Sequence, residues 1–245
     1  MEAKIKAGYE LTKIFSAVGH LTEEATLCFK PSGLEITEAN NSNISMLSVA
    51  IQPSLLTEYI SNQEVKAGVN IANLNKLLKT LPKKSEFSIS LSSIALEIKS
   101  SNKAYSVPII EHKSNINKEP EIEFTNTLSF NTAEFMEALK NLSQISTIAH
   151  INISNRLINL SAEGDAGSVE NEYSDGNMII KSTEPIINLC FNIKEMQKLI
   201  KEADKKGKIG LYLKNGEPLK VVYELAGQKI RGFLAPYIES EDEDA

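Results

Sequence analysis

The side chains that could carry out catalysis are few and scattered. His20, His112 and His150 lie far apart, and none has neighbouring ligands at the spacing of a metal site. The glycine-rich residues 163–167 lack the lysine and hydroxyl of a phosphate-binding loop, and a hairpin turn between two strands explains them. No serine stands in a nucleophile-elbow pattern. We therefore expect no enzymatic activity, no metal and no cofactor.

The two cysteines and the ends of the chain bear on the cellular compartment. Cys28 and Cys190 each lie in an apolar, strand-like stretch, as buried free thiols do. No apolar run is long enough to cross a membrane, and the first residues enter a strand-like segment without a signal-peptide pattern. These features predict a globular protein of a reducing, intracellular compartment.

Lysines form the one chemically suggestive pattern in the chain. Four segments have apolar residues at helical spacing on one face and lysines on the other: residues 9–21, 71–81, 132–145 and 193–203. One basic face is most often just solvated, but four at equivalent places favour a track that attracts phosphate without reading bases. The lysines expected to face DNA are Lys13, Lys76, Lys79, Lys140, Lys194, Lys198, Lys201 and Lys205.

The elements that must position these lysines occur twice. A helix, strand, turn and two further strands fill residues 9–51, and the same order returns over residues 132–173. Each half then has a second helix and closing strands, and the halves align at an offset of 122 residues. Two copies of one plan, strand-rich and with two helices each, predict an α+β fold with helices on one face of antiparallel sheets.

Composition sets the domain boundaries that we expect. Residues 111–121 are polar, include Pro120 and hold one isolated apolar side chain, Ile116, which is typical of a linker. The predicted domains are therefore 1–110 and 122–238, and residues 239–245 form an acidic tail. Five acids lie in that tail, so the net charge of −6 would be −1 without them.

The chain resembles the proliferating cell nuclear antigen (PCNA) family of sliding clamps along its whole length. The segment Asn70–Lys79 is similar to the family's second helix, and the pairs Glu134-Phe135 and Leu142-Ser143 recur in its third. Residues 217–221 match a proline-leucine strand start, and Leu234-Ala235-Pro236 matches the family's ending. The resemblance implies a closed ring of three two-domain subunits around duplex DNA, with helices inside and sheets outside.

The resemblance also implies a groove that binds short peptides of client proteins. Its apolar pocket would receive aromatic and aliphatic side chains, with backbone pairing along the C-terminal segment. Ordinary strand core is the alternative for Ile44 and Met46, and the loop at 39–43 lacks the family's usual aspartate and histidine. The groove residues so implied are Ala39, Asn43, Ile44, Met46, Ile116, Pro218, Phe233, Ala235, Pro236 and Ile238.

Subunit contact in the family joins one edge strand of each domain, here residues 104–110 and 168–174. Pro108 limits backbone pairing on one side of its strand, as suits an edge. Charge between Lys103 and Glu170 or Glu172 would bias the choice of partner. The interface residues so implied are Tyr105, Val107, Ile109, Val169, Glu170 and Tyr173.

These observations predict a DNA polymerase processivity clamp, cytoplasmic in an archaeon and nuclear in a eukaryote. Its expected partners are duplex DNA, an ATP-driven clamp loader, and DNA polymerase, flap endonuclease and DNA ligase through client peptides. Two further subunits, identical or paralogous, would complete the ring. The alternative is a subunit of a heterotrimeric or checkpoint-type clamp with different clients.

Overall fold

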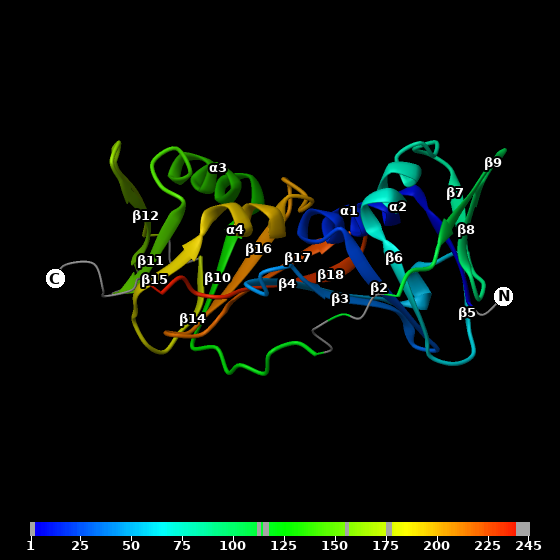
Figure 1. Cartoon of the computed structure of the whole chain (residues 1–245). Helices are drawn as coiled ribbons and strands as arrows, with labels where there is room; N and C mark the ends of the chain where they lie inside the picture. Colours follow the sequence, from blue (N-terminus) through cyan, green and yellow to red (C-terminus); the bar gives the residue numbers. More distant parts are fainter. Residues whose placement is uncertain (1–2, 112–113, 115–117, 155–156, 175–177, 239–245) are drawn as a thin grey trace. The chain divides into compact units, whose positions relative to one another are not determined.

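The chain folds into two compact units: Met1–Pro120 with Glu224–Arg231, and Glu121–Tyr223 with Gly232–Ala245. The computed structural model describes residues 3–111, 114, 118–154, 157–174 and 178–238 (Figure 1). The α+β class expected from the repeated pattern is confirmed, since each unit combines antiparallel sheets with two α-helices.

Within Met1–Pro120, the described residues of the first unit form nine strands, two helices and two short 3₁₀ turns. In chain order they are β1 (Ala3–Gly8), η1 (Tyr9–Leu11), α1 (Thr12–Leu21), β2 (Glu24–Lys30), β3 (Gly33–Ala39), β4 (Ser45–Ile51), η2 (Pro53–Leu55), β5 (Glu58–Ser61), β6 (Val65–Asn70), α2 (Ile71–Leu78), β7 (Glu86–Leu91), β8 (Ala95–Ser100) and β9 (Lys103–Pro108). One sheet has the strand order β5-β1-β7-β8-β9, and the strands of the other run in the order β4-β3-β2-β6.

The remaining elements repeat the same succession. They are β10 (Asn126–Asn131), α3 (Thr132–Leu142), β11 (Ile148–Ser154), β12 (Leu157–Gly164), β13 (Gly167–Tyr173), β14 (Ile179–Ser182), β15 (Ile186–Asn192), α4 (Ile193–Ile200), β16 (Lys208–Leu213), β17 (Leu219–Leu225) and β18 (Gln228–Leu234). The strand orders β14-β10-β16-β17-β18 and β13-β12-β11-β15 match the orders β5-β1-β7-β8-β9 and β4-β3-β2-β6. The sequence offset is confirmed by α2 and α4, which begin at residues 71 and 193, 122 positions apart.

In each unit the two helices pack against one another and against the sheets. Their apolar stripes are fully buried, with Phe15 and Leu74 in the first unit and Phe135 and Met196 in the second at no measurable exposure. Figure 1 shows α1 beside α2 and α3 beside α4. The opposite helix faces carry the polar side chains, so the core dictates which residues the helices present to solvent.

The helices end sooner than apolar periodicity predicts. α2 ends at Leu78 rather than 81, α3 at Leu142 rather than 145, and α4 at Ile200 rather than 203. After α2 the amides of Thr80 and Leu81 donate to carbonyls three residues back, because Pro82 disfavours helical backbone before it. Leu81 is still buried, so its apolar side chain indicates a place in the core and not helical backbone.

Candidate DNA-facing and partner-binding surfaces

The second helix of each unit begins at an asparagine that caps it. Asn70 Oδ1 accepts from the amide of Asn73 at 2.8 Å, and Asn192 Oδ1 accepts from the amide of Glu195 at 3.0 Å. Each bond satisfies one of the free N–H groups at a helix start and fixes where the first turn begins. The caps therefore set the rotation at which α2 and α4 present their lysines.

The structure places the predicted DNA-facing lysines on the solvent side of their helices. All are exposed except Lys198, which is half-buried. Three of them pair with an acid one turn earlier: Lys13 with Glu10 at 2.5 Å, Lys140 with Glu137 at 3.7 Å and Lys198 with Glu195 at 2.6 Å. These acids, which the lysine pattern alone did not weigh, reduce the local positive charge.

In the first unit the predicted groove residues cluster around the β3–β4 turn. Asn40, which sequence reasoning missed, orders the turn, because its Oδ1 accepts from the amides of Ile44 at 3.0 Å and Ser45 at 3.3 Å. Asn43 has a positive φ of 56°, a conformation that asparagine tolerates better than most residues. Ile44 is 38% exposed and Met46 is buried.

Two further groove residues were predicted in this part of the chain, Ala39 and Ile116. Ala39 is half-buried at the end of β3. Ile116 lies outside the described residues, although Ser114 beside it donates from Oγ to the Thr37 carbonyl at 3.0 Å. The asparagine-rich run after Ala39 could have predicted the turn, since asparagine side chains hydrogen-bond to nearby backbone groups and so favour turns.

In the second unit the predicted groove residues lie just before β17, at the end of β18 and after it. Pro218, Ala235 and Pro236 are half-buried, and Ile238 is 83% exposed. Phe233 is only 3% exposed. The C-terminal segment is tied to its own unit, because the Tyr237 amide donates to the Cys190 carbonyl at 2.7 Å.

The two predicted contact strands both lie at the edges of their sheets. β9 is outermost in its five-stranded sheet and β13 in its four-stranded sheet. Of the expected interface residues, Tyr105, Ile109 and Val169 are half-buried, Glu170 is exposed and Val107 is buried. Tyr173 packs edge-on against Phe130 of its own unit, with ring centroids 5.3 Å apart, and burial raises the pKa of its phenol.

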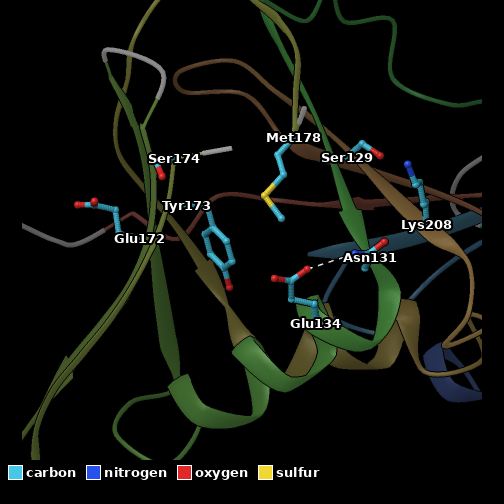
Figure 2. Close-up of a pocket in the computed structure, with 8 residues that line it drawn as sticks. All are labelled: Ser129, Asn131, Glu134, Glu172, Tyr173, Ser174, Met178 and Lys208. Atoms are coloured by element: carbon cyan, nitrogen blue, oxygen red, sulfur yellow. Dashed lines mark hydrogen bonds between the residues drawn. The ribbon is translucent and has the colours of Figure 1, made fainter. Parts of the chain in front are cut away.

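A pocket of about 470 Å³ opens beside β13, between it and the start of α3. Figure 2 shows Glu134 and Tyr173 pointing into it together with Met178, while Asn131 Nδ2 donates to Glu134 Oε2 at 3.4 Å. Lys208 lines the pocket too.

A second pocket, also of about 470 Å³, lies over β11, β12 and β13, and His150 is one of the residues that line it. His150 also lies close to Cys190. His150 Nδ1 is 3.2 Å from Cys190 Sγ and 2.8 Å from Asn188 Oδ1. The sequence did not predict this pair, because the two residues are far apart in the chain and meet only through the register of β11 and β15. Among the described residues no group of three His, Cys, Asp or Glu could hold a metal.

No described helix is both long and apolar enough to cross a bilayer.

Models of the PCNA family match almost the whole chain. The model described as proliferating cell nuclear antigen, N-terminal domain, matches residues 1–119, and the one described as its C-terminal domain matches residues 118–238. A DNA polymerase sliding clamp of Nitrosopumilus maritimus is 25% identical over 97% of this chain and 98% of its own. Proliferating cell nuclear antigen of Saccharomyces cerevisiae is 22% identical over 99% of this chain and 100% of its own.

Solved structures of the family share this fold. The A. fulgidus PCNA bound to the C-terminal region of FEN-1 superposes with a TM-score of 0.88 at 22% identity, covering 98% of this chain and 100% of that one. A chain of the PCNA2–PCNA3 complex from Sulfolobus tokodaii gives 0.83 at 20% identity, covering 96% of this chain and 100% of that one. Two repeated units, four lysine-bearing helices and family models that together match residues 1–238 agree, and the chain belongs to the proliferating cell nuclear antigen family of DNA polymerase sliding clamps.

Proposed function

We propose that the chain is one subunit of a three-membered ring that encircles duplex DNA and tethers replication and repair enzymes to it. The observation that carries the proposal is the repetition itself. Each unit presents two helices with exposed lysines, and each has an outermost strand, β9 or β13, without a described neighbour on one side. A head-to-tail contact between such strands closes into a ring when the rotation per subunit suits it.

The lysines support sequence-independent contact with the DNA backbone. Lys76, Lys79, Lys194, Lys201 and Lys205 are exposed on the helices or just after them. No arginine or aromatic side chain occurs in α2 or α4, so the surface suits phosphate and not base recognition. Weak contact is adequate for a ring, because topology holds it on the duplex while it slides.

Client proteins would bind through short peptides at the groove residues implied by the family. The solved A. fulgidus PCNA carries the C-terminal region of FEN-1, which supports a peptide of this kind as a ligand here. DNA polymerase and DNA ligase are the further clients that we propose, and a separate ATP-driven loader would open the ring. The protein itself would catalyse no reaction, and would act wherever the chromosomal DNA is kept.

Light scattering of the purified chain tests ring formation. A homotrimer has three times the 27.0 kDa of the chain, about 81 kDa. A stable monomer would instead favour the second candidate, a heteromeric ring, which the fold shared with the PCNA2–PCNA3 complex supports. Failure to form a ring with any paralogue of the same organism would contradict both.

A further inference from the structure

Asn188 interrupts β15 with a bulge that turns its side chain toward His150 of β11. The register of the two strands shifts between Ile151 and Ile153, so that two residues of β15 oppose one of β11. Asn188 has a positive φ of 48°, and its amide donates to Asn152 Oδ1 at 2.6 Å, which holds the bulge in place. Bulges commonly re-aim a side chain. Here the bulge brings Asn188 Oδ1 to 2.8 Å from His150 Nδ1.

A thiol lies at the same point of the sheet. Cys190 pairs with His150 across β15 and β11, and its Sγ is 3.2 Å from His150 Nδ1. The same sulfur is 3.3 Å from the Asn188 carbonyl oxygen and 3.6 Å from Asn188 Oδ1. One nitrogen and two oxygens therefore lie within 3.6 Å of one sulfur.

These spacings are close to those of ligand atoms around one small cation. Tetrahedral zinc has Zn–N and Zn–O distances of about 2.0 to 2.2 Å and a Zn–S distance of about 2.3 Å, which set its ligand atoms about 3.3 to 3.8 Å apart. Three of the four separations, at 3.2, 3.3 and 3.6 Å, agree closely with that range. The fourth, 2.8 Å between His150 Nδ1 and Asn188 Oδ1, would widen by a small rotation of the exposed Asn188 side chain.

The four donor atoms also suit zinc in their chemistry. Imidazole nitrogen and thiolate sulfur are the ligands of its closed structural sites, in which four protein donors surround the ion. The third residue here is an asparagine and not a further His, Cys, Asp or Glu, so its two oxygens would complete the coordination. With one thiolate and one imidazole, such a site binds zinc more weakly than sites with three or four of these ligands.

The pocket over β11, β12 and β13 gives a cation a route to these donors. His150 and Asn188 both line it, and so do Glu163 and Glu170. Carboxylates in a cleft raise the local concentration of cations. Cys190 is only 4% exposed, so we expect an ion to reach its thiol from this pocket.

We propose that His150, Cys190 and Asn188 form a structural site for a divalent cation of zinc's class. Binding replaces the S–H bond of Cys190 with a metal–sulfur bond, and the proton leaves to water or buffer. The Cys190 carbonyl accepts the Tyr237 amide at 2.7 Å, so the ion would steady the strand that the C-terminal segment contacts. The inference goes beyond the proposed function, because it depends on no ring, DNA or client peptide.

Cobalt(II) titration of the reduced, metal-free chain tests the proposal. Cobalt takes the same ligands as zinc, and a thiolate bound to it absorbs in the near ultraviolet by charge transfer. We expect this band to grow with added cobalt, to saturate at an equimolar ratio, and to vanish when zinc displaces the cobalt. The melting temperature should rise in parallel, because the ion binds the folded state.

Three substitutions test the ligands, and a fourth is the control. Cys190→Ser should abolish the band, whereas Cys28→Ser, which removes the thiol on β2, should leave it unchanged. His150→Gln should weaken cobalt binding by about tenfold or more, since an imidazole ligand is lost. Asn188→Asp should instead strengthen it, because a carboxylate oxygen is a better ligand for zinc and cobalt than an amide oxygen.

The outcomes do not rely on one variant. A band that persists in Cys190→Ser, a band lost in Cys28→Ser, or no band in the wild-type chain overturns the proposal. Unchanged affinity in His150→Gln, or no gain in Asn188→Asp, also overturns the site as drawn. Thermal unfolding checks that each variant is folded. If Cys190→Ser is not, the opposite effects expected of His150→Gln and Asn188→Asp still decide.

Discussion

Lys198 in α4 and Lys201 just after it make different contributions to the protein. Lys198 Nζ lies 2.6 Å from the Glu195 carboxylate, whose side chain is only 11% exposed. Lys201 follows the last turn of α4, fully exposed. A nearly buried carboxylate needs its partner, because desolvation without compensation is costly. Lys198 therefore contributes to the fold as well as to surface charge, whereas Lys201 contributes mainly charge.

Reversing each lysine should separate these two contributions. We expect Lys201→Glu to weaken binding to a labelled duplex and to lower the slope of log affinity against log salt by about 1, with little change in thermal stability. Lys198→Glu should in addition destabilise the protein by about 2 kcal/mol, because Glu195 then faces a like charge. Anisotropy across a salt series and urea unfolding measure the two effects. Equal stability of the two variants would contradict the role given to Lys198.

Tyr223 should make the stability of the fold depend on pH in the alkaline range. Its hydroxyl donates to the Leu199 carbonyl at 2.9 Å, and burial raises the pKa of the phenol well above its usual value. A raised pKa in the folded state stabilises the protein fully below the unfolded value of about 10, and this stability is lost as pH rises beyond it. Unfolding the chain frees the phenol to ionise, so high pH favours unfolding.

Tyr223→Phe should flatten this alkaline loss. At neutral pH the variant should be less stable by about 1 kcal/mol, because the Leu199 carbonyl loses its donor. Urea unfolding at neutral pH and above pH 10 provides the comparison. Tyr59 also has a phenol whose pKa burial raises, so some alkaline loss should remain in the variant. An unchanged alkaline slope would show that Tyr223 does not supply it.

At the scale of the elements, the second helix of each unit depends on one asparagine. Asn70 and Asn192 both accept a capping hydrogen bond, whereas Asn131 at the start of α3 makes none to the helix backbone. We expect Asn70→Ala and Asn192→Ala each to cost about 1 kcal/mol of stability. Asn131→Ala is the matched control and should cost clearly less. Urea unfolding of the three variants checks the order, which a larger loss in Asn131→Ala would reverse.

Periodicity predicted the helices well because each buries one continuous apolar stripe. Their ends were predicted too late, since Leu81 and Ala203 are buried by turns that follow the helices. A buried apolar side chain at helical spacing does not reveal whether its backbone is still helical. The contact strands expected at residues 104–110 and 168–174 were predicted to within two residues, since β9 spans Lys103–Pro108 and β13 spans Gly167–Tyr173.

The candidate surfaces were harder to predict than the elements that carry them. The outward lysines follow from helical spacing alone, but the partners of Lys13, Lys140 and Lys198 depend on side-chain rotamers. The contact of the Lys220 ammonium with the Phe233 ring joins two strands, so it depends on a register that no local pattern specifies. The pairing of His150 with Cys190 was missed for the same reason.

At the scale of the whole molecule, our proposal places a subunit contact at the open edge of β9. The Ile109 amide donates to the Ile94 carbonyl toward β8, at 3.1 Å. Alternation along a strand then directs the amides of residues 103, 105 and 107 to β8, and those of Ala104 and Ser106 to the open edge. Pro108, which also faces that edge, has no amide hydrogen to offer.

Ser106→Pro should therefore prevent ring assembly while leaving the subunit folded. The substitution removes an outward backbone donor and none of the backbone hydrogen bonds to β8. Ser106→Ala is the control, because it loses only the 2.7 Å side-chain bond to Glu97 and keeps the amide. Light scattering should give about 27 kDa for the proline variant and about 81 kDa for the alanine variant. A proline variant of wild-type mass would place the subunit contact elsewhere.

The membership of Glu224–Arg231 in the first unit has a consequence for how the protein is made. This hairpin, whose turn at Ala226 and Gly227 has positive φ at both residues, leaves the ribosome only after residues 121–223 of the second unit. Domains usually fold as they emerge, N-terminal first. Here the first unit cannot complete its fold until a segment more than a hundred residues downstream of Pro120 has been synthesised. Contacts so distant in sequence slow folding, so a chain released before residue 231 should keep its first unit exposed to chaperones and proteases.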